Sequence, residues 1–202
     1  MKLSLKKVMK LSLKKVMKLL VTRHGETEGN VKRILAGVKD ELTVKGVEQA
    51  KKLAKRLKNE KIDAIYSSPI LRAKRTTEEI VKYHKNVDFY LVDELREGDL
   101  GSYKYKPMDR VDWNNLPSDV ENRTSLYRRA KKIVNKAFKK YPKGTVLFVA
   151  HNGVNKAIIR VIKNLHPEDK ISIPQHNTAL TVCEINSKGK KIKLFNCTKH
   201  LE

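Results

Sequence analysis

The sequence predicts an α/β fold: a three-layer sandwich with a mostly parallel central sheet and helices on both faces. The first observation behind this prediction is that short apolar runs alternate with segments of helical apolar spacing, which implies parallel strands joined by covering helices. The second is that polar residues directly follow several strand ends, where open α/β sheets bind ligands. The chain has 202 residues, enough for one domain with a sizeable core, and it contains no internal linker.

Short apolar runs predict six strands, at residues 18–22, 62–67, 88–92, 145–150, 179–185 and 190–196. We expect the first strand at the centre of the sheet, and the fourth is the most apolar run of the chain. The last two flank an Asn-Ser-Lys-Gly sequence at 186–189, which is typical of a β-hairpin. In that hairpin Cys183 faces a residue near Ile192 rather than Cys197. We therefore expect no disulfide, which fits a reducing cytosol.

Helical spacing predicts four helices: 43–58, 68–83, one marked by apolar residues between 126 and 138, and one marked by those between 154 and 162. Thr43, Ser68 and Asn152 are the expected N-caps of the first, second and fourth helices. Pro69 suits the first helical position of the second, and the third ends before Pro142. The residues expected to face the core are Val44, Val47, Ala50, Ala54 and Leu57 on the first helix and Leu71, Ile80 and Val81 on the second.

Residues 93–121 are rich in Gly, Pro, Asp and Asn and predict a long loop. Loops of this length in a compact domain usually carry function. Tyr103 and Trp113 have side chains that stack on rings, and Lys104 attracts negative charge, so we expect the 98–120 part to select the ligand. An alternative stays open, in which these aromatic residues only anchor the loop to the core.

The chain is strongly basic, with 45 Lys and Arg residues against 22 Asp and Glu residues. Such an excess attracts anions, among them nucleotides, sugar phosphates, nucleic acids and membrane headgroups. The lysines are dispersed through every predicted helix, which favours ordinary solvated faces. No RNA-binding aromatic signature, zinc-finger spacing or basic-zipper pattern is present, so we expect no specific nucleic-acid partner. No run reaches the ~18 apolar residues of a membrane span, and no membrane association is expected.

Residues 1–16 consist of two copies of Met-Lys-Leu-Ser-Leu-Lys-Lys-Val, and a third Met-Lys-Leu begins at Met17. An eight-residue duplication is too short for a repeat fold. We interpret it as a duplicated basic extension derived from cloning or from an upstream start site, with Met17 as the natural start. Residues 17–202 then form a single domain. A weak amphipathic helix that anchors to a membrane surface is the alternative for residues 1–16.

Polar residues that suit phosphate chemistry follow the predicted strand ends. Arg23 and His24 come directly after the first strand, and His151 comes directly after the most apolar one. Arg72 follows the second strand, and Glu97 lies in the long loop. The arginines supply forked donors to a phosphoryl group, and a helix N-terminus at His151 also favours an anion. With Glu97 as proton donor, the set is complete for phosphoryl transfer by a covalent histidine.

These residues lie in motifs that resemble the histidine phosphatase superfamily, also called phosphoglycerate mutase-like. The matching segments, in the family's order, are 20–30 (LVTRHGETEGN), 40–50 (DELTVKGVEQA), 67–76 (SSPILRAKRT), 95–101 (LREGDLG) and 146–154 (VLFVAHNGV). The resemblance implies that His24 is the phosphorylated nucleophile and that Glu97 is the acid/base. The residues that it implies around the phosphoryl group are Arg23, Arg72, His151, Asn30 and Asn152.

The chain departs from the family pattern at two points. The family commonly has His-Gly where this chain has His151-Asn152, and here the backbone N–H of Asn152 is expected to take the glycine's place. After the acid the family often continues Gly-x-Trp-Glu-Gly, whereas this chain reads Gly-Ser-Tyr-Lys-Tyr at 101–105. We therefore expect a different loop geometry and a different choice of substrate.

The resemblance and the residues together predict a metal-independent histidine acid-type phosphatase, a cytoplasmic hydrolase of small phosphorylated metabolites that needs no cofactor. A metal site built from His24, His151 and Glu97 would lack recognisable ligand spacing, so none is expected. The first alternative is a cofactor-dependent phosphoglycerate mutase. Only 53 residues separate Glu97 from His151, and the mutases carry a longer insertion there, which favours the phosphatase. The second alternative, a non-catalytic basic nucleic-acid-binding protein, is supported by net charge alone. A homodimer is left open.

Overall fold

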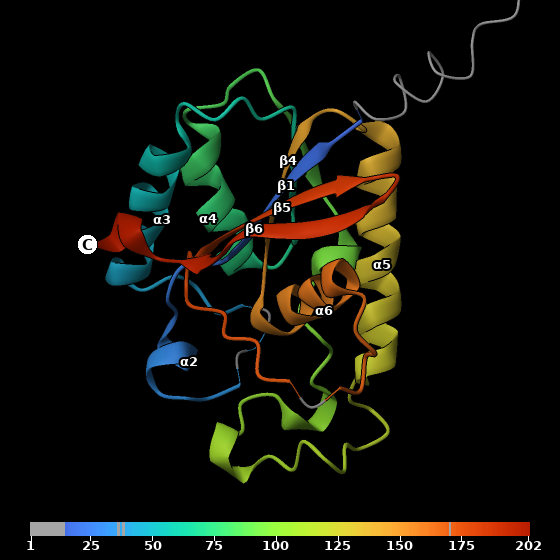
Figure 1. Cartoon of the computed structure of the whole chain (residues 1–202). Helices are drawn as coiled ribbons and strands as arrows, with labels where there is room; N and C mark the ends of the chain where they lie inside the picture. Colours follow the sequence, from blue (N-terminus) through green and yellow to red (C-terminus); the bar gives the residue numbers. More distant parts are fainter. Residues whose placement is uncertain (1–14, 36, 38, 170) are drawn as a thin grey trace, which may run out of the picture.

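The computed structural model describes residues 15–35, 37, 39–169 and 171–202. Within these residues a six-stranded sheet has the order β3-β2-β4-β1-β5-β6 (Figure 1). Its strands are β1 Met17–Arg23, β2 Ala64–Ser67, β3 Asp88–Leu91, β4 Thr145–Ala150, β5 Leu180–Asn186 and β6 Gly189–Cys197. The first four run parallel to one another, and β5 and β6 form an antiparallel hairpin at one edge. The predicted α/β fold with a mostly parallel sheet is confirmed, and β4 has the predicted bounds.

Helices cover both faces of the sheet, with α3 and α4 on one face and α5 and α6 on the other (Figure 1). The helices are α2 Glu28–Val31, α3 Val44–Leu57, α4 Leu71–Val81, α5 Arg123–Lys140 and α6 Asn152–Lys163. Alternate residues of a strand point to opposite faces, so Leu19 packs in the α5–α6 core cluster and Leu20 in the α3–α4 cluster. This two-sided burial is the reason that the strands read as unbroken apolar runs.

The N-cap predicted for α3 is confirmed, because the Thr43 hydroxyl accepts the backbone N–H of Gly46 at 2.9 Å. One predicted core residue of this helix is wrong: the Val44 side chain is 86% exposed. Leu53, which the prediction omitted, is fully buried instead. Val44 precedes the buried Gly46 by two positions, a rotation of roughly 200° around the helix axis, so it faces solvent.

The predicted start of α4 is wrong, because the helix begins at Leu71 and not at Ser68–Pro69. Its N-cap residue is Ile70, which provides no side-chain hydrogen bond. The Ser68 hydroxyl instead accepts the N–H of Ile70 at 3.2 Å. The buried face of α4 comprises Arg72, Ala73, Thr76, Thr77 and Ile80, while the predicted core residues Leu71 and Val81 are only half-buried. This face is more polar than predicted because Arg72 reaches the cavity described below, Thr76 accepts the N–H of Gly25, and Thr77 donates to the Ser67 hydroxyl.

The cap predicted for α6 is also wrong. His151, with extended backbone angles (φ −131°, ψ 174°), occupies the N-cap position, and Asn152 is the first helical residue. The side chain of His151 makes no capping hydrogen bond. The first N–H groups of the helix are bound from elsewhere in the chain, by the Glu97 carboxylate.

Residues 93–121 form the predicted long loop, interrupted by three single-turn 3₁₀ helices at Asp93–Leu95, Gly101–Tyr103 and Met108–Arg110. The two ends of the loop meet, because the N–H of Glu121 donates to the Asp99 carbonyl at 2.7 Å. The N–H of Asp99 in turn donates to the Glu121 carboxylate at 3.2 Å. Four buried side chains form a small core between the loop and the segment around residue 35: Leu35, Tyr103, Val111 and Val120.

The closing hairpin has the predicted register, with Cys183 opposite Ile192, and both Cys183 and Cys197 are free thiols. In the described part of the chain, every helix is too short or too polar to span a bilayer. The duplicated extension predicted at residues 1–16 falls outside the described residues, apart from its last two. Its origin therefore stays a prediction, as does the assignment of residues 17–202 to a single domain.

Candidate active site

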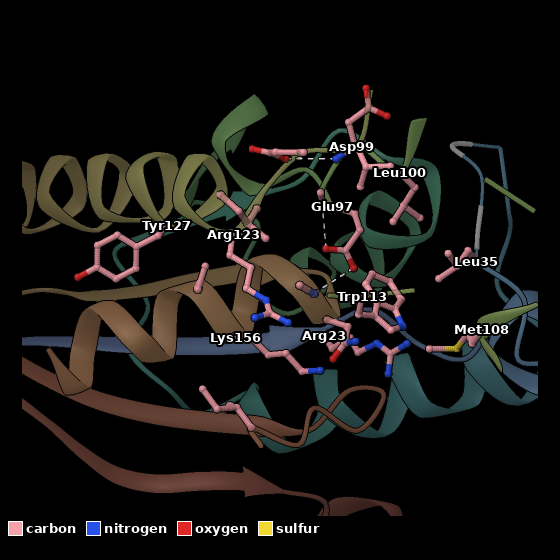
Figure 2. Close-up of a pocket in the computed structure, with 18 of the residues that line it drawn as sticks. Arg23, Leu35, Glu97, Asp99, Leu100, Met108, Trp113, Arg123, Tyr127 and Lys156 are labelled. Carbon is pink, nitrogen blue, oxygen red and sulfur yellow. Dashed lines mark hydrogen bonds between the residues drawn. The ribbon is translucent and has the colours of Figure 1, made fainter. Parts of the chain in front are cut away.

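A cavity of about 440 Å³ opens at the carboxyl ends of the parallel strands. Arg23 and His24 reach it from the end of β1, Arg72 from α4, Glu97 from the long loop, and Asn152 from the first turn of α6. Figure 2 shows the Glu97 carboxylate beside Arg23, with Trp113 and Lys156 nearby. The structure thus brings together, at one place, residues that are up to 129 positions apart in the sequence.

His24 is buried, with 2% of its surface exposed, and both ring nitrogens have a defined environment. Its Nδ1 lies 2.6 Å from the Gly25 carbonyl oxygen, which can only accept, so Nδ1 carries the proton. Its Nε2 therefore holds a lone pair, and it accepts a hydrogen bond from Arg72 Nε at 3.2 Å. Burial, and then the charges of Arg23 and Arg72, hold the pKa of His24 well below its usual value. The imidazole is neutral at neutral pH.

Gly25 is required where it stands because the first turn of α3 passes directly beside it. A side chain at this position would collide with the backbone of Gly46. The Gly25 N–H also donates to the Thr76 hydroxyl at 3.0 Å. These contacts fix the turn that carries His24 against α3 and α4.

Two arginines surround the His24 ring. Arg72 is 3% exposed, and its second nitrogen donates to the Gly37 carbonyl at 2.7 Å. Arg23 donates to the Gln175 carbonyl at 2.8 Å, while its Nε has no partner among the described residues. Burial lowers the pKa of both guanidinium groups, and Glu97 opposes that shift. Even so, both stay charged, which makes the site attractive to an anion.

His151 lies beside His24, with the ring centroids 5.1 Å apart. Its Nε2 is 2.8 Å from the Ser68 hydroxyl, and its buried Nδ1 has no partner among the described residues. Burial, and then the charges of Arg72 and Arg23, lower the pKa of His151 well below its usual value. Ser68 was predicted at the end of the second strand and as a helix cap, and its contact with His151, 83 positions away, could not be foreseen from the local sequence.

Glu97 accepts three backbone hydrogen bonds, from Gly98 at 3.0 Å, Gly153 at 3.1 Å and Val154 at 3.2 Å. The last two are N–H groups of the first turn of α6, so Glu97 caps this helix from a distant part of the chain. Of the two neighbouring carboxylates, Glu94 contacts Lys132 at 3.1 Å and Asp99 contacts Lys104 at 2.8 Å. Glu97 is the carboxylate that faces the arginines.

Arg129, on α5, ties the segment that carries Glu97 to the rest of the domain. Its guanidinium contacts the Glu121 carboxylate at 2.7 and 2.9 Å. It also donates to the backbone carbonyls of Glu94, Arg96 and Glu97 at 2.7 to 3.1 Å. Five hydrogen bonds from one side chain hold this stretch of backbone in place. Nothing in the sequence distinguishes Arg129 from the other basic residues of its helix.

Asn30 also lies at the cavity, on the short helix α2 that the sequence had not predicted. Its Oδ1 accepts from the Thr27 N–H at 3.2 Å and from Asn177 Nδ2 at 3.0 Å. Asn177 also donates to the His24 carbonyl at 3.0 Å, so this pair of amides supports the backbone of the histidine. Among the described residues, no hydrogen bond involves Asn30 Nδ2, which leaves it as a donor for a ligand.

The three residues predicted in the substrate loop have different surroundings. Trp113 lines the main cavity and is 41% exposed. Tyr103 is instead buried in the small core that it forms with Leu35, Val111 and Val120. Lys104 contacts Asp99 at 2.8 Å and borders a smaller neighbouring hollow. Lys156 and Arg123 also line the main cavity, although neither had been predicted there. Among the described residues, no group of three or more His, Cys, Asp or Glu residues is arranged to hold a metal ion.

Comparison with known proteins gives a consistent result. The family model of the histidine phosphatase superfamily (branch 1) matches residues 19–198. A probable phosphatase of Schizosaccharomyces pombe is 37% identical over 199 residues, which cover 90% of this chain and 70% of the relative. Phosphoserine phosphatase 1 of Hydrogenobacter thermophilus is 30% identical over 198 residues, which cover 90% of this chain and 93% of the relative.

Solved structures agree with the sequence comparisons. The YhfR protein of Bacillus stearothermophilus superimposes with a TM-score of 0.83 at 27% identity, covering 92% of this chain and 100% of that protein. A phosphoserine phosphatase of Entamoeba histolytica, crystallised with 3-phosphoglyceric acid, superimposes with a TM-score of 0.79 at 26% identity. That match covers 92% of this chain and 100% of the other.

Proposed function

The chain belongs to branch 1 of the histidine phosphatase superfamily, and from that premise we propose that it is a metal-independent phosphatase of small phosphomonoesters, acting through a phosphohistidine on His24. The observation that carries this proposal is the state of His24: a buried, neutral imidazole with a defined Nε2 lone pair, close to the buried Arg72 and the half-buried Arg23. Phosphatases among its relatives support the same reaction class. The free thiols of Cys183 and Cys197 support a cytoplasmic location.

In the first step, His24 Nε2 attacks the phosphorus atom, and the bond between phosphorus and the leaving oxygen breaks as the P–N bond forms. Protonated Glu97 gives its proton to the leaving alkoxide, which departs as an alcohol. Arg23 and Arg72 stabilise the charge on the phosphoryl oxygens, and we assign His151 and Asn152 to the same group. Because two arginines already supply the positive charge that this step needs, the mechanism requires no metal.

In the second step, the Glu97 carboxylate takes a proton from a water molecule whose oxygen attacks the phosphorus atom. The P–N bond breaks, inorganic phosphate leaves, and His24 returns to its neutral form while Glu97 is protonated again. The hydrogen bonds from Gly98, Gly153 and Val154 keep Glu97 at the edge of the cavity during both steps. Asn30 is assigned to the phosphoryl group through its Nδ2 donor.

The test is hydrolysis of p-nitrophenyl phosphate by the wild type and by His24→Ala. We expect His24→Ala to abolish turnover, and we expect rapid quenching of the wild type to trap an acid-labile phosphoryl group that the variant lacks. His200→Ala is the control, because His200 lies beside Arg56 at the far end of α3. Full activity in His24→Ala, or complete loss of wild-type activity in EDTA, would overturn the mechanism.

The phosphoglycerate mutase alternative is tested separately. One relative, at 28% identity, is a 2,3-bisphosphoglycerate-dependent phosphoglycerate mutase of Bartonella bacilliformis. The enzyme is incubated with 3-phosphoglycerate and 2,3-bisphosphoglycerate. We expect release of inorganic phosphate to exceed formation of 2-phosphoglycerate. If formation of 2-phosphoglycerate exceeds release of inorganic phosphate, the mutase is the better interpretation and the phosphatase proposal is wrong.

A further inference from the structure

The cavity extends well beyond the residues assigned to the phosphoryl group, along one face of α6. Asn152, Lys156 and Arg160 recur every four residues on this face, and all three line the cavity. Each step of four residues advances roughly 6 Å along a helix, so Lys156 lies one turn away from the phosphoryl end. Arg123, at the start of α5, points into the same region, as Figure 2 shows.

Lys156 is a half-buried cation that lacks an ion-pair partner. In the described part of the chain, no carboxylate lies within 4 Å of its Nζ. Burial lowers the pKa of Lys156, Glu97 opposes the shift, and the charges of Arg23, Arg160 and Arg123 lower the pKa further. A charged group in such surroundings is unfavourable until an anion joins it.

The two neighbouring arginines differ in how firmly they are held. Arg160 donates to the Asp169 carbonyl at 3.1 Å, so it is fixed against the segment that precedes β5. Arg123 has only a long contact with Glu168, at 3.7 Å, which leaves its guanidinium able to bind a ligand. Arg160 Nε has no partner among the described residues, but the side chain is held in place through its other nitrogen. Lys156 and Arg123 are therefore the two cations of this region that no hydrogen bond to a described residue holds in place.

Apolar side chains form much of the remaining wall of the cavity: Leu100, Trp113, Leu116, Val120, Leu126 and Ile173. The carboxylates of Asp99 and Glu121 also line it, and they contact Lys104 and Arg129. A ligand that spans the cavity therefore meets cations at both ends and apolar or aromatic contacts between them.

We propose that Lys156 and Arg123 form a second anion subsite, which selects phosphomonoesters that carry another negative charge, a carboxylate or a phosphate, on an apolar or aromatic body. This inference rests on the proposed function, because it takes the His24 end as the place of the reacting phosphoryl group. Lys156 and Arg123 bind substrate in this scheme and take no part in the bond-breaking steps.

The test compares p-nitrophenyl phosphate with 4-carboxyphenyl phosphate, whose nitro and carboxylate groups share a shape and differ in charge. Lys156→Met keeps an unbranched side chain and removes the positive charge of the ammonium group. Arg123→Gln keeps a polar side chain and removes the positive charge of the guanidinium group. We expect each variant to lower the ratio of kcat/KM for the carboxylate ester to kcat/KM for the nitro ester by about tenfold or more. Leaving-group differences cancel when this ratio is compared between proteins.

Two further measurements sharpen the test. Hydroquinone bisphosphate replaces the carboxylate by a phosphate, so its ratio to the nitro ester distinguishes the two kinds of second anion. Lys163→Met is the matched control, because Lys163 is an exposed residue at the other end of α6, and we expect the ratios in this variant to equal those of the wild type.

The proposal is overturned if both variants keep the wild-type ratios within about twofold, or if Lys156→Met lowers all esters equally. Calorimetric binding of both aryl esters to His24→Ala distinguishes a failure of the subsite proposal from a failure of the proposed phosphatase function. A preference for the carboxylate ester that is lost in His24→Ala/Lys156→Met supports the subsite even if the wild type hydrolyses nothing. Equal binding of both esters to His24→Ala overturns the subsite even if the wild type is an active phosphatase.

Discussion

Gly153→Ala is expected to impair catalysis without destabilising the fold. An ideal Cβ on Gly153 would lie 2.6 Å from Glu97 Oε1 and 3.5 Å from Leu126 Cδ2. Only the first contact is too short. Since a carbon–oxygen contact normally stays near 3.3 Å, the carboxylate must move back by roughly 0.7 Å. The side chain of Glu97 is flexible enough to do so, and the backbone need not shift.

The size of the effect follows from this displacement. Misplacing a catalytic group by about 1 Å costs on the order of 100-fold in rate, so we expect kcat for p-nitrophenyl phosphate to fall about 10- to 100-fold. Gly153 lies in the first turn of α6, where alanine favours the helix by up to about 1 kcal/mol. We therefore expect the free energy of unfolding, measured by urea denaturation, to stay equal or rise slightly.

Gly189→Ala is the matched control, because a Cβ at Gly189 meets no atom within 4 Å. Wild-type kcat in Gly153→Ala would show that the position of Glu97 does not matter for the reaction, and the acid/base role would have to be given up. A fall in kcat accompanied by an equal loss of stability would instead make Gly153 a purely structural residue, which also contradicts the reasoning.

Three further outcomes follow from the structure. The free energy of unfolding should fall as the pH drops below about 6.5, because the pKa values of His24 and His151 are lowered in the folded state and only the unfolded chain takes up these protons. Each histidine contributes up to about 1.4 kcal/mol per pH unit. A free energy of unfolding that stays constant between pH 7.5 and 5.5 in urea denaturation would contradict this. Thr43→Ala should cost about 1 kcal/mol in the same assay and leave kcat unchanged, since it removes the cap of α3 and a 3.2 Å contact with the Glu26 carboxylate but no hydrogen bond to a described residue of the cavity. Arg129→Lys should lower both kcat and the melting temperature, because an ammonium group cannot reach the Glu121 carboxylate and three carbonyls together, and wild-type values for both would refute its anchoring role.

The fold was predictable because its signals are local. The apolar run at residues 145–150 predicted both ends of β4, and Thr43 was predicted as the cap of α3 because it stands directly before that helix. The caps of α4 and α6 were mispredicted for the opposite reason. At α6 the first N–H groups bind Glu97, which lies 55 residues before the helix begins, and no rule about neighbouring residues anticipates such a partner.

Part of the candidate active site could also be predicted from the sequence. Arg23, His24 and His151 stand out because they directly follow buried strands, while Arg72 follows the second strand and Glu97 lies in the long loop. Motif resemblance added the role of each residue. The basic residues of α5 and α6 neither follow a strand end directly nor belong to one of these motifs, so the sequence does not single them out. Lys156 on α6 has the same neighbours in sequence as a solvated lysine, and only the fold shows that a loop and a second helix cover it.

The part of the loop between Asp99 and Glu121 is closed at its base by their backbone hydrogen bond, and it packs on Leu35 through a small shared core. It also pairs with the backbone of residues 33–35, while Arg129 holds the backbone of Glu97, which precedes this part of the loop. Changing its length is inexpensive, since each doubling of a flexible loop costs only about 0.6 kcal/mol. Substitutions confined to residues 100–120 therefore reshape the cavity wall that Trp113, Leu116 and Val120 provide and leave the hydrogen bonds of His24 in place.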